Sequence, residues 1–151
     1  MAFWEQIFFW ITLVIYALGS GGYIYSLVFR NDKIFPKLLL LSGTGLVTHT
    51  MAVASRLVAQ GHLPWSSDYD NGLMGGLFII AFTVYVGVRQ VSLRILGAAT
   101  LPCTLLIMGY GVMKHPTLGP MAASLKSVWL SIHVFFAWLS FGAYALAMAA
   151  G

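Results

Sequence analysis

Long apolar runs, separated by short polar connections, dominate the pattern of this chain. Five of these runs reach or approach the roughly 20 residues that an α-helix needs to cross a bilayer. They are, approximately, Phe3–Phe29, Leu38–Gln60, Leu73–Val88, Ile95–Met113 and Val128–Ala150. We therefore predict an all-α integral membrane protein, a helical bundle with about five transmembrane helices. The third run is short, and we expect it to stand nearly upright or to thin the bilayer locally.

The composition supports the membrane class. Of the 151 residues, 60% are hydrophobic and 8% are charged, whereas soluble domains carry about 25% charged residues. A chain this short has too much surface to hide so many apolar side chains in a core, so we predict a single membrane domain over residues 1–151. The formal net charge of +4 does not indicate nucleic-acid binding, because Lys and Arg lie mainly at helix ends and in connections. With Cys103 as the single cysteine and no C-x-x-C-H motif, an internal disulfide and covalent c-type haem attachment are both excluded.

Two basic connections predict the orientation in the membrane. The stretches "RNDKIFPK" and "RQVSLR" contain five Lys and Arg residues, and such residues are enriched on the cytoplasmic side. We therefore expect the N-terminus outside and the C-terminus inside, in a bacterial inner (cytoplasmic) membrane. The last run ends in "ALAMAAG" without a basic anchor, so we expect Gly151 to lie against another chain or to continue into further sequence.

Two histidines fall inside or at the edge of predicted helices, and each is seven residues from a cation. His49 precedes Arg56, and His133 follows Lys126. Seven residues are nearly two helical turns, so each pair is expected to share a helix face, about 10 Å apart along the axis. Because the two helices run in opposite directions, both cations are expected on the outer side of their histidines.

This layout suits one b-type haem, with neutral imidazoles ligating the iron from both faces and cations holding the propionates. Trp129, one turn before His133, would line the porphyrin. Gly45, one turn before His49, would let the ring approach. The predicted cofactor-binding residues are His49, His133, Arg56, Lys126, Trp129 and Gly45, with His49 and His133 on the iron. The alternative is that both histidines are buried polar residues, hydrogen-bonded to neighbouring helices. No catalytic residue is predicted.

The connection "GHLPWSSDYDNG" is expected on the outer side and offers His62, Trp65 and Asp70 as possible contacts. Trp65 and Tyr69 are natural membrane-interface anchors. The stretch Asp70-Asn71-Gly72 is alternatively a simple turn before the third helix. Two aspartates are too few to predict a metal site.

Two motifs stand apart from the apolar pattern: "HTMAVASRLVAQGHLPWSSDYDNGL" and "SLKSVWLSIHVFFAWLSFGAYAL". They resemble the H-T…R…G-H-x-P-x-S…Y-E and L-Q-S-x-W-L-x-x-H-V segments of the system II cytochrome c assembly family (the ResC/CcsA type). Asp70 stands where the family has Glu, and the resemblance covers only the front half of the family. The matching residues are His49, Thr50, Arg56, Gly61, His62, Pro64, Ser66, Tyr69, Leu125, Ser127, Trp129, Leu130, His133 and Val134.

The resemblance implies a haem-handling subunit of cytochrome c biogenesis. Family members export haem and present it to apocytochrome c outside the membrane, and the histidine that matches His133 is implicated as an axial ligand. Membrane lipid, other membrane subunits and a periplasmic c-type cytochrome or apocytochrome are the implied partners. The family's tryptophan-rich W-G-x-x-W-x-W-D segment has no counterpart among the five tryptophans here, so we do not expect the chain to be an enzyme on its own.

Two other functions remain open. The chain is alternatively a b-haem electron-transfer subunit of a respiratory complex, linking quinol to a periplasmic redox partner through His49 and His133. The second alternative is a structural membrane anchor without a cofactor.

Overall fold

The computed structural model describes residues 2–114, 118 and 126–151. Within them, no strand occurs, and two short 3₁₀ helices, η1 (Asp32–Ile34) and η2 (Val91–Leu96), lie in the connections. Five helical segments are long and apolar enough to cross a membrane, which confirms the prediction of an all-α membrane protein. The long helices are α1 (Phe3–Val28), α2 (Phe35–Gln60), α3 (Asp68–Arg89), α4 (Gly97–Met113) and α5 (Val128–Ala150).

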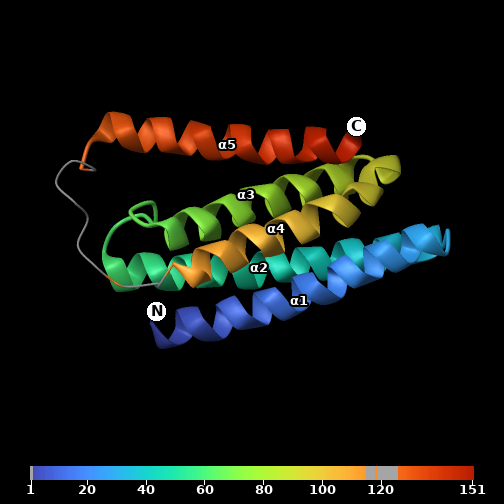
Figure 1. Ribbon diagram of the computed structural model, residues 1–151, viewed down its shortest axis with the longest axis horizontal. Helices are drawn as coiled ribbons and strands as arrows, with labels where there is room; N and C mark the ends of the chain where they lie inside the picture. The colour runs from blue at the N-terminus through green and yellow to red at the C-terminus, as the bar shows by residue number, and fades with distance from the viewer. Residues whose placement is uncertain (1, 115–117, 119–125) are drawn as a thin grey trace.

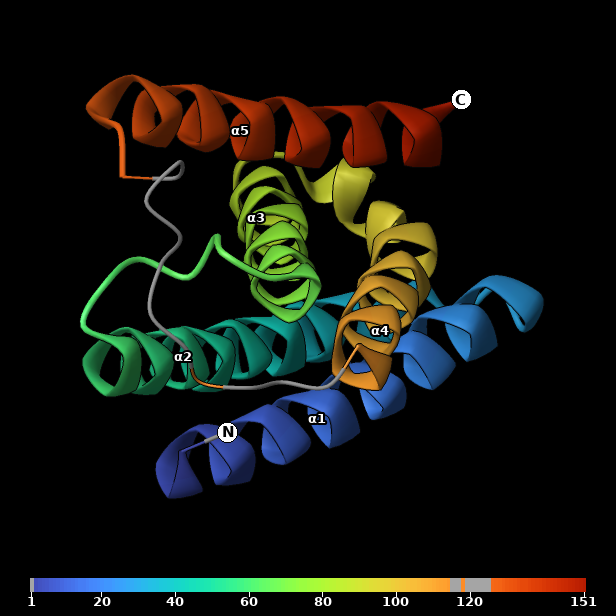
Figure 2. The ribbon, with the colours of Figure 1, turned by 60° about the vertical axis from the view of Figure 1, so that its left-hand side comes forward.

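The helices are arranged in three tiers (Figure 1). α1 and α2 pack against each other as an antiparallel pair, α3 and α4 form the middle tier, and α5 lies on the far side of α3 and α4. Figure 2 shows the same order from a second direction, with α5 crossing above the ends of α3 and α4. The start of α1, the end of α2 and the starts of α3 and α5 lie at one end of the bundle, called here the loop end.

The interface between α1 and α2 has the spacing of a coiled coil. Alternating steps of three and four residues keep one helix face turned to a partner. The buried stripe on α1 consists of Glu5, Phe9, Thr12, Tyr16, Gly19, Tyr23 and Ser26, and that on α2 of Leu38, Ser42, Gly45, His49, Ala52 and Arg56. Many of these residues are polar, so the interior of the bundle carries hydrogen-bonding groups while the outside is apolar.

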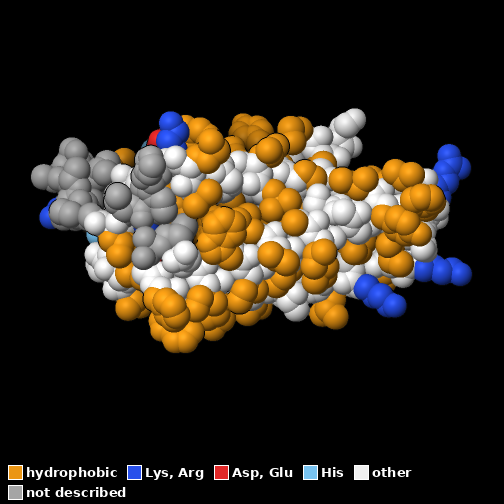
Figure 3. All heavy atoms as spheres, turned by 60° about the horizontal axis from the view of Figure 1, so that its bottom comes forward, with side chains coloured by type: hydrophobic (Ala, Val, Ile, Leu, Met, Phe, Trp, Pro, Cys, Tyr) orange, Lys and Arg blue, Asp and Glu red, His pale blue; other side chains and the backbone are white. Residues whose placement is uncertain are grey.

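The surface supports this description. Large apolar side chains such as Leu18, Val58 and Leu106 are 63%, 84% and 75% exposed, and Figure 3 shows hydrophobic side chains spread along the length of the bundle. An apolar exterior around partly polar contacts is the arrangement expected where the solvent is lipid, because lipid gives apolar side chains no reason to turn inward.

The third helix is longer than its hydrophobic run predicts. α3 begins at Asp68 and has 22 residues, so the expectation of a short third helix was wrong. Asp70, Asn71 and Gly72 lie in its first turns rather than in a separate turn. The helix begins here because Ser67 is the N-cap: its hydroxyl accepts the backbone N–H of Asp70, which satisfies a donor that would otherwise be unpaired.

Glycines set the contact between α3 and α4. A Cβ built on Gly72 would lie 2.8 Å from the backbone oxygen of Ile107 and 3.1 Å from the Cα of Gly111. The two backbones therefore touch directly, which only residues without a side chain allow. α5 is held more loosely, since Gly142 and Ala145 are its only buried residues within the described part of the chain.

Candidate functional site

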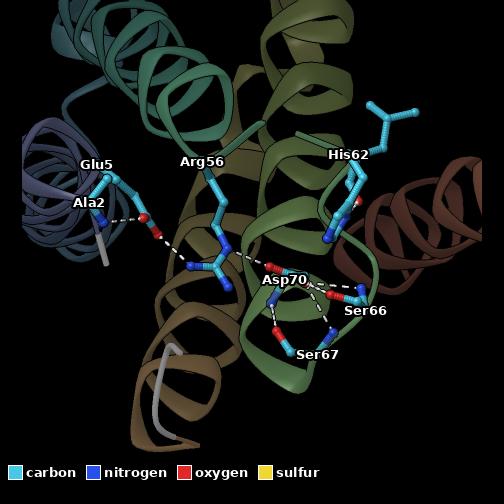
Figure 4. A network of polar contacts seen from close by, with 8 residues as sticks. Ala2, Glu5, Arg56, His62, Ser66, Ser67 and Asp70 are labelled. Atoms are coloured by element: carbon cyan, nitrogen blue, oxygen red, sulfur yellow. Dashed lines mark hydrogen bonds and ion pairs between the residues drawn. The ribbon is translucent and has the colours of Figure 1, made fainter. Parts of the chain in front are cut away.

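Arg56 lies at the centre of a buried ionic cluster between three helices (Figure 4). Its Nε–H donates to Asp70 Oδ1 on α3, and its Nη1 donates to Glu5 Oε1 on α1 at 3.1 Å. All three residues are 0% exposed. The guanidinium also lies over the ring of Tyr69, 4.5 Å from its centroid. One arginine thus ties α1 and α3 to α2.

Asp70 extends the cluster into the connection between α2 and α3. Its Oδ2 accepts the backbone N–H groups of Ser66 and Ser67, each at 3.0 Å, and the hydroxyl of Ser66 at 2.9 Å. Glu5 Oε2 in turn accepts the backbone N–H of Ala2 at 2.9 Å. Both carboxylates are therefore held by several donors, as buried charges must be to offset the cost of leaving water.

His49 is also fully buried, on the stripe of α2 that packs against α1. Its Nδ1 lies 3.3 Å from the hydroxyl of Tyr16 on α1, and the ring lies beside the backbone of Leu73 on α3. A Cβ on Gly76 would be 3.2 Å from His49 Cε1, so the imidazole packs tightly against α3. Nε2 has no hydrogen bond of normal geometry to the residues that the structure describes.

Gly45 contacts the ring of Tyr16. A Cβ at this glycine would overlap the Tyr16 ring and would lie 3.0 Å from Ile15. We expected a porphyrin ring beside Gly45. The side chain of Tyr16 fills that space instead. The prediction that His49 and Arg56 share one face of a helix is confirmed, because both lie on the buried stripe of α2.

The remaining predicted haem residues lie near the start of α5 and are exposed. Trp129 is 80% exposed, and His133, one turn further on, is exposed as well. Lys126 is exposed and precedes the N-cap Ser127. The prediction from the seven-residue spacing assumed that Lys126 and His133 lie on one helix. Because Lys126 lies before the start of α5, helical periodicity does not put the two side chains on one face.

The structure does not bring His49 and His133 together. α5 faces α3 with Gly142, where a Cβ would lie 2.6 Å from the ring of Phe82. His133 precedes Gly142 by nine residues, which is about 180° around a helix with 3.6 residues per turn. The imidazole of His133 therefore leaves the side of α5 opposite to α3, whereas His49 is enclosed among α1, α2, α3 and α4.

The other predicted contacts occupy the loop end. His62 and Trp65 are partly buried in the connection between α2 and α3, and His62 Nδ1 lies 3.0 Å from the carbonyl oxygen of Leu63. Of the three outer-loop residues, Asp70 belongs to the buried cluster. Leu125, which contributes to the second motif, lies outside the described residues.

Two important residues had not been singled out in the sequence. Glu5 is the only acidic residue in the first apolar run, and a lone carboxylate there is costly unless a cation pairs with it. Arg56, the basic residue inside the second apolar run, is that partner. Tyr16 gave no comparable signal, because a tyrosine in an apolar helix is ordinary and only the tertiary structure places its hydroxyl beside His49.

The fold and this site define a multi-pass helical membrane protein whose helices are joined by buried ionic and polar contacts. No protein-family model and no solved structure matches the chain. Curated relatives do match it. The chain is 29% identical over 140 residues to the cytochrome c biogenesis protein CcsA of Microcystis aeruginosa, covering 80% of this chain and 40% of the relative.

Two further CcsA proteins agree. That of Nostoc punctiforme is 29% identical over 138 residues, covering 80% of this chain and 37% of the relative. That of Pyropia yezoensis is 26% identical over 141 residues, covering 86% of this chain and 44% of the relative. The resemblance to the CcsA type is thereby confirmed, and the chain spans about two fifths of the length of these relatives.

Proposed function

We propose that this chain is a membrane subunit of cytochrome c biogenesis that handles haem at the loop end of the bundle, with His133 as an axial ligand. The observation that carries the proposal is the exposed imidazole of His133 with Trp129 one turn away on the same face of α5. Imidazole is a common axial ligand of haem iron, and an aromatic ring beside it offers a flat surface to a porphyrin. An exposed position leaves room for a second protein to approach.

The residues near His133 fit such a group better than those near His49. Around His49 the side chain of Tyr16 and the backbone of α3 occupy the contact distances. A porphyrin there would have to separate the helices, so we assign no haem to His49. The role of His49 is instead to hold the hydroxyl of Tyr16, and the role of Arg56 is to hold α1 and α3.

In this proposal, haem is the group that is handed on to the apocytochrome, and the chain would bind and orient it. His133 would hold the iron through an imidazole nitrogen, Trp129 would offer its ring to the porphyrin, and Lys126, near the start of α5, would be a cation available to a propionate.

We expect the purified chain in detergent to take up haem and to show its Soret absorption signal, and His133→Ala to lose that signal, because the bond between this chain and the iron disappears. His62→Ala is the matched control at the same end of the bundle and should keep the signal. His49→Ala should also keep it, provided that size-exclusion chromatography shows a folded protein. A His133→Ala variant with the wild-type spectrum would refute the assignment, and a folded wild-type chain that takes up no haem would favour the structural anchor.

We also propose that the loop end faces the periplasm-like side, with the N-terminus outside and the C-terminus inside. The basic residues of the two connections at the opposite end support this orientation. Reporter fusions after Asp68 should be active only as outside reporters, and fusions after Arg89 only as inside reporters. The reverse result would overturn the orientation.

A further inference from the structure

The end of the bundle opposite the loop end concentrates positive charge and is called here the basic end. It carries five of the eight Lys and Arg residues and only one of the four acidic residues, Asp32. The cations lie in the connections from α1 to α2 and from α3 to α4 or in the helix turns beside them. Figure 3 shows such side chains projecting from this end of the molecule. They are Arg30, Lys33, Lys37, Arg89 and Arg94.

A pocket of about 430 Å³ opens between these two connections. Arg94, Ser92 and Asp32 contribute polar groups to its wall, and the apolar part of the wall consists of Phe35, Pro36, Val91 and Ile95. The pocket is thus partly polar and partly apolar, and its polar wall holds the guanidinium of Arg94, the hydroxyl of Ser92 and the carboxylate of Asp32.

Arg94 is held in place by the end of α3. Its Nε–H donates to the carbonyl oxygen of Gly87 at 3.1 Å, one of the terminal helix carbonyls that lack a partner within the helix. A Cβ on Gly87 would lie 3.8 Å from Arg94 Cγ, so the arginine stem rests on the glycine backbone. A guanidinium has five N–H donors, and those on the terminal nitrogens remain to bind an anion bidentately.

An apolar groove continues from the same arginine along the membrane-facing side. This second pocket, of about 310 Å³, lies between α2 and α3 and shares Pro36 and Arg94 with the first. Beyond Arg94 its wall is entirely apolar, formed by Leu39, Leu40, Gly43, Val84 and Val88. Nothing lies within 4 Å of a Cβ built on Gly43, so the glycine leaves the groove open.

From this geometry we propose a binding site for one anionic phospholipid at the basic end. The phosphate of the headgroup binds Arg94 and Ser92, and an acyl chain lies in the groove over Gly43. The surrounding cations match the negative headgroup, and basic pockets between transmembrane helices bind such headgroups in other proteins. A free phosphate would use the polar pocket alone and would leave the groove empty, which is why we assign the site to a lipid.

The wild-type chain in detergent should retain phosphatidylglycerol several-fold better than phosphatidylcholine with the same acyl chains, as measured by native mass spectrometry. Arg94→Gln should abolish this preference, whereas Lys114→Gln, at the loop end, should preserve it. Gly43→Leu fills the groove without changing any charge and should lower retention of phosphatidylglycerol several-fold.

Three results would overturn the proposal. Equal retention of the two lipids by the wild type would show that the site does not select the headgroup. Wild-type retention by Gly43→Leu would show that no acyl chain lies in the groove. Displacement of phosphatidylglycerol by millimolar inorganic phosphate would assign the pocket to a free anion. None of these measurements involves haem, so their outcome is independent of the proposed function.

Discussion

Replacing Arg56 with methionine is expected to lower the free energy of unfolding by about 3–5 kcal/mol, the usual cost of removing one partner from a buried ion pair. The substitution keeps an unbranched, apolar stem but leaves Glu5 and Asp70 without their shared cation. Both carboxylates are completely buried and cannot turn to water. The variant should therefore unfold at a lower denaturant concentration in detergent, followed by tryptophan fluorescence.

Lys114→Met is the matched control for this experiment. Lys114 is exposed at the loop end, so its replacement removes the same charge without unpairing a buried group and should change stability by less than about 0.5 kcal/mol. Adding Glu5→Gln and Asp70→Asn to Arg56→Met should recover part of the loss, because no unpaired charge remains. If Arg56→Met and Lys114→Met unfolded alike, the cluster would not hold α1 and α3 to α2.

Gly45→Ala is expected to destabilise the protein by about 1–3 kcal/mol, the usual cost of overpacking a filled interior. The added methyl group would overlap the ring of Tyr16, which is 0% exposed and has no empty space to enter. Moving this ring would also lengthen the contact between its hydroxyl and His49 Nδ1. The effect should appear as a lower midpoint of unfolding.

Gly43→Ala provides the comparison on the same helix. It changes the same residue type two positions earlier, but a Cβ there meets nothing within 4 Å. Its stability should equal or exceed that of the wild type, because Ala has the higher helix propensity and its methyl group meets no neighbour. An equal loss of stability in both variants would mean that contact with Tyr16 does not decide the result, since helix propensity alone favours Ala over Gly.

The positions of the helices could be predicted from the sequence because they depend on local properties. Apolar runs of sufficient length must become helices in lipid, since every backbone N–H and C=O needs a partner within the segment. α5 begins at Val128 and ends at Ala150, as the apolar run predicts. The start of α3 was missed because its first turn is polar, so that the apolar pattern begins only at Leu73.

The partners of the charged and polar residues depended on the tertiary structure. The seven-residue spacing correctly put His49 and Arg56 on one face of α2, since both positions lie on a single helix and its periodicity is fixed. Whether that face met a cofactor or another helix depended on how α1 and α3 pack against it. The same limit applied to His133, because a sequence gives the spacing along a helix but not its rotation about its own axis. Contacts with α3 fix that rotation, and they turn His133 away from the interior in which His49 lies.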